Sequence, residues 1–225
     1  DLRVLLFGGG RCACQVMDIY RDDPERKAVA ILDDNRSLWG KTVYGVPIVG
    51  GQDRLESLYC EKLFDKALCS ISSSIPARTQ FRKRCEELGI PMANAIDRTA
   101  KISADVKLGT GNVLCAFCHI GTSTVIGDNN FFSAYNSFDH HSGLGSDIST
   151  GPGCIASGIV KIGDRVRMGT GVFIEPYLEI GDGVQIASGA VIVRSVPAEH
   201  AVKIKVSRVV LRPIAQYGQE FSGQV

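Results

Sequence analysis

The chain has 225 residues, of which 44% are hydrophobic and 22% charged, with a formal net charge of +1. These proportions are ordinary for a globular protein, and the small net charge gives no basis for a nucleic-acid or membrane surface. No apolar run is long enough to cross a bilayer and no segment has the features of a secretory signal, so we expect a cytoplasmic protein of one large or two modest domains.

The first 95 residues alternate apolar stretches with helical patterns. Residues 3–7 predict a buried parallel strand, which is followed by three glycines and a predicted helix over 12–20. Further strands are predicted over 27–32 and 66–71, and a helix over 79–88 that ends at Gly89. Strands that alternate with helices are typical of a parallel α/β sheet, so we expect a Rossmann-like domain over residues 1–95.

A glycine pattern stands at the first strand-to-helix junction of this domain. Residues 8–13 match G-x-G-x-x-A, in which backbone N–H groups at a helix start would face a phosphate. Asp33 and Asp34 end the second strand and could accept hydrogen bonds from a ribose or a base. The same pattern also fits a tight turn with no ligand. A redox NAD site is disfavoured, because no second domain is present to offer a hydride acceptor.

A repeat of six residues organises the second half of the chain. From Ile102 to Ile192 every sixth residue is apolar except Thr150, a small or branched residue often stands two positions earlier, and Gly often follows. We expect the paired residues to point inward and Gly to relieve an awkward φ. Three hexads would close one coil, so that residues 18 apart stack at ~4.8 Å. This predicts a parallel β-helix of about five coils over 96–197, and a strand over 203–210 within a C-terminal segment, 198–225.

The eight cysteines are scattered among apolar residues, and we interpret them as reduced core residues. Cys115 and Cys118 have the spacing of a metal-binding pair, but no second pair accompanies them. The repeat places Cys118 inside the β-helix. We therefore expect no metal site.

Together the two halves resemble the hexapeptide-repeat sugar acyltransferases of bacteria. This family includes sugar-nucleotide N-acetyltransferases with a Rossmann-like N-terminal domain and sialic acid O-acetyltransferase-like proteins. The segments that carry the resemblance are 7–13, 31–34, 44–51, 138–140 and 187–197. The resemblance implies a left-handed β-helix, acetyl-CoA as co-substrate and a homotrimer with active sites between subunits. It also implies a role in O-antigen, capsule or other glycan synthesis in the bacterial cytoplasm.

Acyl transfer from a thioester needs a base for the attacking group and a donor for the carbonyl oxygen. His140 matches the family's base, and the imidazole of histidine titrates near neutral pH. Gly158 lies 18 residues later, where the family uses a backbone N–H to bind the acetyl carbonyl. His141 stands where the family usually has an acid that orients the base. Either Asp139 takes over that role, or no residue orients the base.

The resemblance also implies contacts with both substrates. For a nucleotide-linked amino sugar the corresponding positions are Gly8, Gly10, Arg11, Cys12, Asp33, Asp34 and Ser73. For acetyl-CoA they are Gly158, Ser149, Thr170 and Ser188. Cys12 replaces a histidine found in many members, and Ser149 replaces a histidine found in some.

An N-acetyltransferase that acts on a nucleotide-linked amino sugar is the function we expect. A sialic acid-type sugar O-acetyltransferase and a non-catalytic protein that binds sugar nucleotides are the alternatives. A zinc hydratase built on a β-helix would need three converging histidines. His119 and His140 are 21 residues apart, and the third histidine of that pattern is absent, which disfavours this class of enzyme.

Overall fold

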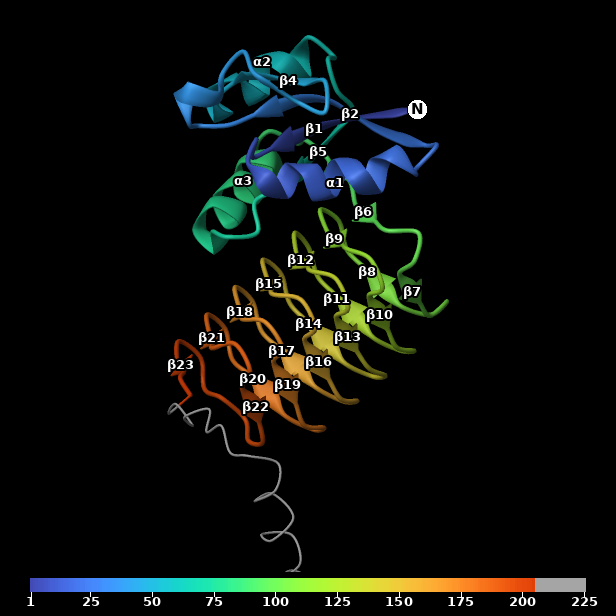
Figure 1. Cartoon of the computed structure of the whole chain (residues 1–225), viewed down its shortest axis with the longest axis vertical. Coiled ribbons are helices and arrows are strands. Elements are labelled where there is room, and N and C mark those ends of the chain that lie inside the picture. Colours follow the sequence, from blue (N-terminus) through green and yellow to red (C-terminus); the bar gives the residue numbers. More distant parts are fainter. Residues whose placement is uncertain (205–225) are drawn as a thin grey trace, which may run out of the picture.

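The computed structural model describes residues 1–204, in which an α/β domain sits over one end of a stacked β-helix (Figure 1). The α/β domain holds one five-stranded sheet in the order β3-β4-β2-β1-β5. Its strands are β1 (Leu2–Phe7), β2 (Arg26–Leu32), β3 (Thr42–Val43), β4 (Val46–Gly50) and β5 (Lys66–Cys69). All pair in parallel except β3, which runs antiparallel to β4. The helices are α1 (Arg11–Arg21), α2 (Leu55–Cys60) and α3 (Ile75–Glu87), with 3₁₀ turns at η1 (Arg36–Leu38) and η2 (Gln52–Arg54).

Helices cover both faces of this sheet. Successive residues of β1 point to opposite sides, so this strand contributes side chains to the core on each face. Val4 and Leu6 join a cluster with Val16 of α1 on one face. Leu5 and Phe7 join a cluster on the other face that includes residues of α2 and α3, and Phe7 stacks on Phe81 with ring centroids 4.6 Å apart. The parallel α/β sheet is thus present, while its Rossmann-like character and the boundary at residue 95 stay predictions.

Two elements of this domain differ from expectation. Helix α3 begins at Ile75, four residues before the predicted start, because the Ser74 hydroxyl accepts from the backbone N–H of Ala77 and Pro76 fits the first turn. Strand β5 ends at Cys69, the partner of Phe7 at the end of β1. Helix α2 and the β3–β4 pair were not predicted.

The second half folds into two-residue strands stacked in three parallel sheets, which fit the left-handed β-helix that the family resemblance implies. One sheet holds β7 (Lys101–Ile102), β10 (His119–Ile120), β13 (Ser137–Phe138), β16 (Ile155–Ala156), β19 (Phe173–Ile174) and β22 (Val191–Ile192). The next holds β8 (Lys107–Leu108), β11 (Val125–Ile126), β14 (Gly143–Leu144), β17 (Lys161–Ile162) and β20 (Glu179–Ile180). The third holds β6 (Ala95–Ile96), β9 (Val113–Leu114), β12 (Phe131–Phe132), β15 (Ser149–Thr150), β18 (Arg167–Met168), β21 (Gln185–Ile186) and β23 (Ala201–Val202).

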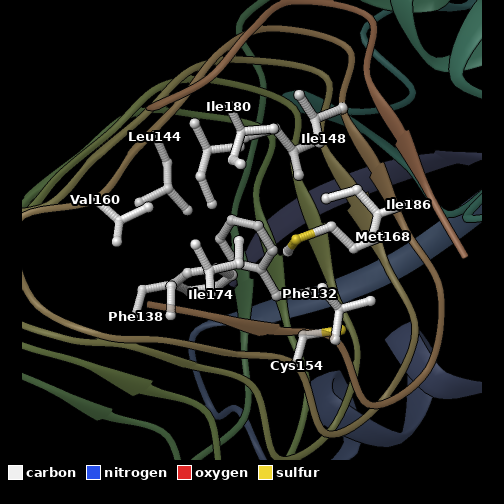
Figure 2. Close-up of a cluster of buried hydrophobic side chains, with 14 of the residues drawn as sticks. Phe132, Phe138, Leu144, Ile148, Cys154, Val160, Met168, Ile174, Ile180 and Ile186 are labelled. Atoms are coloured by element: carbon white, nitrogen blue, oxygen red, sulfur yellow. The ribbon is translucent and has the colours of Figure 1, made fainter. Parts of the chain in front are cut away.

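Stacking follows the predicted interval of 18 residues. His119 lies beside Ser137, which lies beside Ile155, and the same interval continues to Val191. The sixteen inward positions are buried except Ile102 and Leu108, which pack on the core from its first coil. Figure 2 shows several of them, among them Phe132, Phe138 and Met168, turned toward one another. The interval shortens after Ile192, since Ile180 bridges to Val196.

The predicted reason for the glycines in the repeat is wrong. The glycines that follow the inward residues do not have positive φ. A Cβ on Gly121 would instead lie 2.5 Å from the backbone nitrogen of His140 in the next coil. Positive φ occurs two residues later in the hexad, at corners occupied by non-glycine residues such as Phe117 and His141 and by glycines such as Gly153. Close stacking of coils, rather than φ, therefore selects glycine here.

The last described strand, β23, ends at Val202. The strand predicted over 203–210 falls largely outside the described residues, as does most of the segment 198–225. Among residues 1–204 no helix is long and apolar enough to span a membrane.

Helix α3 joins the two halves through a buried corner of the β-helix. The guanidinium of Arg78 is fully buried and donates to the carbonyl oxygens of Cys69, Ile71 and Asn129. One turn later, Arg82 pairs with the buried carboxylate of Asp147 at 2.7 Å. These contacts fix the α/β domain on the corner formed by residues 129 and 147.

Candidate active site

His140 lies on an exposed corner of the β-helix, directly after β13. Gly158 stands beneath it one coil later, and a Cβ built there would lie 2.5 Å from His140 Nε2. Glycine therefore leaves the room that the imidazole occupies. The N–H of Ile159 donates to the His140 carbonyl at 2.9 Å, which ties the two coils together at this point. The Gly158 N–H has no acceptor within residues 1–204.

The ring of His141 faces the ring of His140. Their Nδ1 atoms are 3.1 Å apart, and the two rings meet edge to face. His141 has φ 56° and its N–H donates to the Thr122 carbonyl of the preceding coil. The Asp139 carboxylate accepts from the backbone N–H of His140 at 2.8 Å. Asp139, which was expected to orient the base if any residue does, thus contacts only the backbone of His140, whereas His141 contacts its ring nitrogen.

The carboxylate of Asp33 holds the glycine turn of the α/β domain in place. One oxygen of this carboxylate accepts from the Gly9 N–H at 2.7 Å and the other accepts from the Asn35 N–H at 2.8 Å. Asp34 in turn accepts from the N–H of Gln52 at 2.8 Å. Both acids therefore also build the loop scaffold, a use that the sequence pattern did not reveal.

Gly8 and Gly10 differ in what their missing side chains allow. Gly8 has φ 109°, and a Cβ there would lie 2.5 Å from Ile71. Gly10 caps α1 and has open space around it, with the exposed Arg11 next in the chain. A depression of about 420 Å³ opens beside this turn, and its lining comprises Gly9, Gly10, Arg11, Cys14, Leu38, Thr42, Val43 and Tyr44. The sequence pattern had not included the 38–43 wall, because its residues carry no motif.

Ser72 connects this domain to the β-helix. Its hydroxyl lies 3.0 Å from the Cys12 thiol, and its carbonyl accepts from the Ser149 hydroxyl at 2.5 Å and from Arg167 at 3.1 Å. Ser149 is only 2% exposed, so the expected coenzyme contact at this residue is not supported. Its hydroxyl instead fixes the loop that carries the exposed Ser73.

Thr170 and Ser188 are exposed and stack on each other, since the Thr170 N–H donates to the Ser188 hydroxyl at 3.0 Å. They follow β18 and β21, whereas His140 follows β13 of a different sheet. A single protomer therefore places the predicted base and these two coenzyme positions on different corners.

Five of the eight cysteines are buried core residues, whereas Cys12 and Cys14 are partly exposed and Cys60 is exposed. Burial raises the pKa of the Cys118 thiol to about 11 and that of Cys115 to about 12. Both thiols are buried, Cys118 within the β-helix as predicted. Within residues 1–204 no three His, Cys, Asp or Glu side chains are grouped as metal ligands.

No family model and no curated protein matches the sequence. Among solved structures, a mutant of GDP-perosamine N-acetyltransferase from Caulobacter crescentus, in complex with CoA and GDP-perosamine, superposes with a TM-score of 0.82. It shares 28% identity over 88% of this chain and 91% of its own. The resemblance predicted from the sequence is confirmed. So is the acyltransferase class.

Two further structures support the fold. The acetyltransferase domain of PglB from Neisseria gonorrhoeae, in complex with acetyl coenzyme A, has a TM-score of 0.80 and 24% identity over 89% of this chain and 95% of its own. WeeI from Acinetobacter baumannii has a TM-score of 0.77 and 23% identity over 90% of this chain and 97% of its own.

Proposed function

We propose that this protein transfers the acetyl group of acetyl-CoA to the amino group of a nucleotide-linked amino sugar. The observation that carries the proposal is the His140 imidazole lying over the Gly158 backbone. It occurs in a chain whose structural neighbour is an N-acetyltransferase of a GDP-linked sugar. Such products feed O-antigen, capsule or other glycan synthesis, which we place in the bacterial cytoplasm.

In the proposed reaction the sugar amine attacks the thioester carbonyl while His140 Nε2 takes a proton from the nitrogen. The Gly158 N–H, which has no acceptor within residues 1–204, donates to the developing oxyanion. The carbon–sulfur bond then breaks and the CoA sulfur receives the proton from His140. A positioned base contributes roughly 10²–10⁴-fold, and one oxyanion donor roughly 10²–10³-fold.

The sugar nucleotide would bind at the glycine turn of a Rossmann-like domain, residues 1–95. Backbone N–H groups at the start of α1 attract a pyrophosphate, and the exposed Arg11 adds a positive charge. The depression of about 420 Å³ beside Gly10 gives room for the ligand. By the family resemblance we also assign Cys12, Asp33, Asp34 and Ser73 to this site, of which Asp33 holds the glycine turn.

A homotrimer would bring the separated parts together. Thr170 and Ser188 lie on a different corner from His140, so one chain's coenzyme positions would serve its neighbour's base. The outer face of one sheet carries Ile155, Phe173 and Val191 in register, all more than 40% exposed. Apolar residues in one stripe are typical of a surface that another subunit covers. Light scattering of the purified chain would test the trimer directly.

The function is tested by incubating the protein with acetyl-CoA and a panel of amino-sugar nucleotides while free CoA is measured. We expect turnover of at least one member and an amide product that resists mild base; an ester would favour the O-acetyltransferase alternative. His140→Asn should lower kcat by roughly 10²–10⁴-fold. His200→Asn changes an exposed histidine after the last inward position and should leave kcat unchanged. Absence of turnover across the panel would contradict the proposal, as would an unaltered His140→Asn enzyme.

A further inference from the structure

The contact between His140 and His141 constrains where protons can be. Their Nδ1 atoms are 3.1 Å apart, and a hydrogen bond between two ring nitrogens holds one proton between them. Either His140 donates and keeps a bare Nε2, or His141 donates and His140 carries its proton on Nε2. Only the first arrangement leaves a base over Gly158.

We propose that His141 is a positioning residue. As a neutral ring it accepts the Nδ1 proton of His140 and so holds Nε2 of His140 in the unprotonated, basic form. The inference rests on the proposed acyl transfer, and it assigns to a second imidazole the orienting role that a carboxylate could also fill.

A neutral acceptor leaves the pair of rings a single vacant nitrogen for a further proton. One added proton, on either ring, places a hydrogen on His140 Nε2, because the shared position is already filled. A second proton would set two N–H groups against each other and separate the rings. Activity should therefore fall once the pair holds one further proton.

The reaction cycle balances within this arrangement. As the amine nitrogen bonds to the acetyl carbon, its proton moves to His140 Nε2, and the resulting imidazolium donates through Nδ1 to His141. This charge-assisted hydrogen bond stabilises the transition state. When the carbon–sulfur bond breaks, the proton passes from Nε2 to the CoA sulfur and both rings are neutral again.

Few other titratable groups stand on the coils that pack against the pair. Asp139 lies on the same strand end and binds the His140 N–H. On the preceding coils, Asp105 is already engaged by Thr122 and Ser123. Two coils later are Glu175 and Tyr177, and the Tyr177 N–H donates to the Gly158 carbonyl. None of these side chains bonds either imidazole within residues 1–204.

Two substitutions separate the roles of His141. His141→Phe removes the acceptor and should lower kcat roughly 10-fold or more at every pH, the scale seen for partners behind an imidazole. Phe is compatible with the corner, because Phe117 and Tyr135 hold the same positive φ at equivalent positions. His141→Glu restores an acceptor but adds a negative charge, which favours protonated His140. Its kcat should recover at high pH, while the acid limb of kcat/KM moves up by about one pH unit.

A direct readout does not depend on activity. In the full-length chain labelled with ¹⁵N-histidine, the four histidines can be assigned with His119→Phe and His200→Asn. We expect His140 protonated at Nδ1 and His141 protonated at Nε2, with His140 losing this preference in His141→Phe.

His140 protonated at Nε2 in the free enzyme would overturn the proposal. An unchanged kcat and pH profile in His141→Phe, or an unmoved acid limb in His141→Glu, would do the same. If the wild type turns over no amino-sugar nucleotide but the expected protonation is seen, the proposed function fails while the pairing of the rings stands. If His141→Phe does not fold, His141→Glu and the wild-type spectrum still decide.

Discussion

The two halves of this molecule build their cores by different rules. In the β-helix one interval of 18 residues determines which residues stack, from His119 to Val191. In the α/β domain β1 divides its residues between two cores, each of which is completed by residues from other strands and helices. A residue of the β-helix can thus be placed by counting, whereas a residue of the α/β domain depends on turns. The candidate base lies in the first kind of structure and the candidate nucleotide site in the second.

The largest effect should come from breaking the stacking at the base. Gly158→Ala places a Cβ where His140 Nε2 now lies, and the ring must move. A displacement of ~1 Å can cost about 10²-fold in rate, so we expect kcat to fall by that order while the melting temperature changes little. Gly143→Ala is the matched control, because its Cβ would meet nothing within 4 Å. Equal kcat values for the two variants would show that stacking does not position the base.

Removing the contacts that Arg78 makes with both halves should have the next largest effect, a loss of stability. Arg78→Met removes a buried cation that donates to three carbonyl groups of both halves and leaves them without a partner. We expect a loss of about 3 kcal/mol in the free energy of unfolding. Arg84→Met removes only exposed pairs with Glu56 and Glu87 and should cost under about 1 kcal/mol. Urea unfolding of both variants measures the difference, and similar midpoints would contradict a structural joint at Arg78.

The sequence predicted the β-helix well because its period is a direct consequence of coil geometry. The inward positions, the burial of Cys118 and the stacking of Gly158 on His140 all follow from that period. The reason for the glycines did not follow, because a close approach between coils and a positive φ both favour glycine. Only the structure separates the two causes at Gly121 and at the neighbouring corners.

Less could be predicted where a side chain meets a partner distant in the sequence. Ser149 looked like a coenzyme contact, but its hydroxyl binds the carbonyl of Ser72, 77 residues away. Arg78 lies just before the helix predicted over 79–88 and has no motif around it, yet it is fully buried. The contact between His140 and His141 depends on side-chain rotamers, which no periodicity reports.

Two glycines allow a direct comparison of the two reasons for glycine, close contact between coils and a positive φ. Gly127→Ala would set a Cβ 2.7 Å from the carbonyl oxygen of Gly145 and should cost about 1–3 kcal/mol, because backbone must move. Gly153→Ala has open space but φ 69°, and should cost about 1 kcal/mol. Thermal unfolding of both variants checks the order. A larger loss in Gly153→Ala would restore φ as the main reason for glycine in this repeat.

The smallest effects concern one exposed acid in each half. Hydrogen bonds from the Arg3 side chain and backbone lower the pKa of Asp65 to about 2, and hydrogen bonds from Ser123 and Thr122 lower the pKa of Asp105. A lowered folded-state pKa adds stability above the ordinary value of 3.8, and this stability is lost as pH falls through the folded-state pKa. Asp65→Asn and Asp105→Asn should therefore each lower the melting temperature slightly at pH 7, with the Asp65→Asn difference fading toward pH 2.

Salt should change the effects of the Asp65→Asn and Asp105→Asn substitutions differently. Asp65 pairs with a cation, and about 1 M salt screens exposed charges to within ~3 Å, so the penalty of Asp65→Asn should shrink. Asp105 is held by hydroxyl and backbone donors instead, so the penalty of Asp105→Asn should persist. Melting curves at low and high salt measure both. If salt changes the two losses of melting temperature equally, the charge of Arg3 does not make Asp65 different from Asp105.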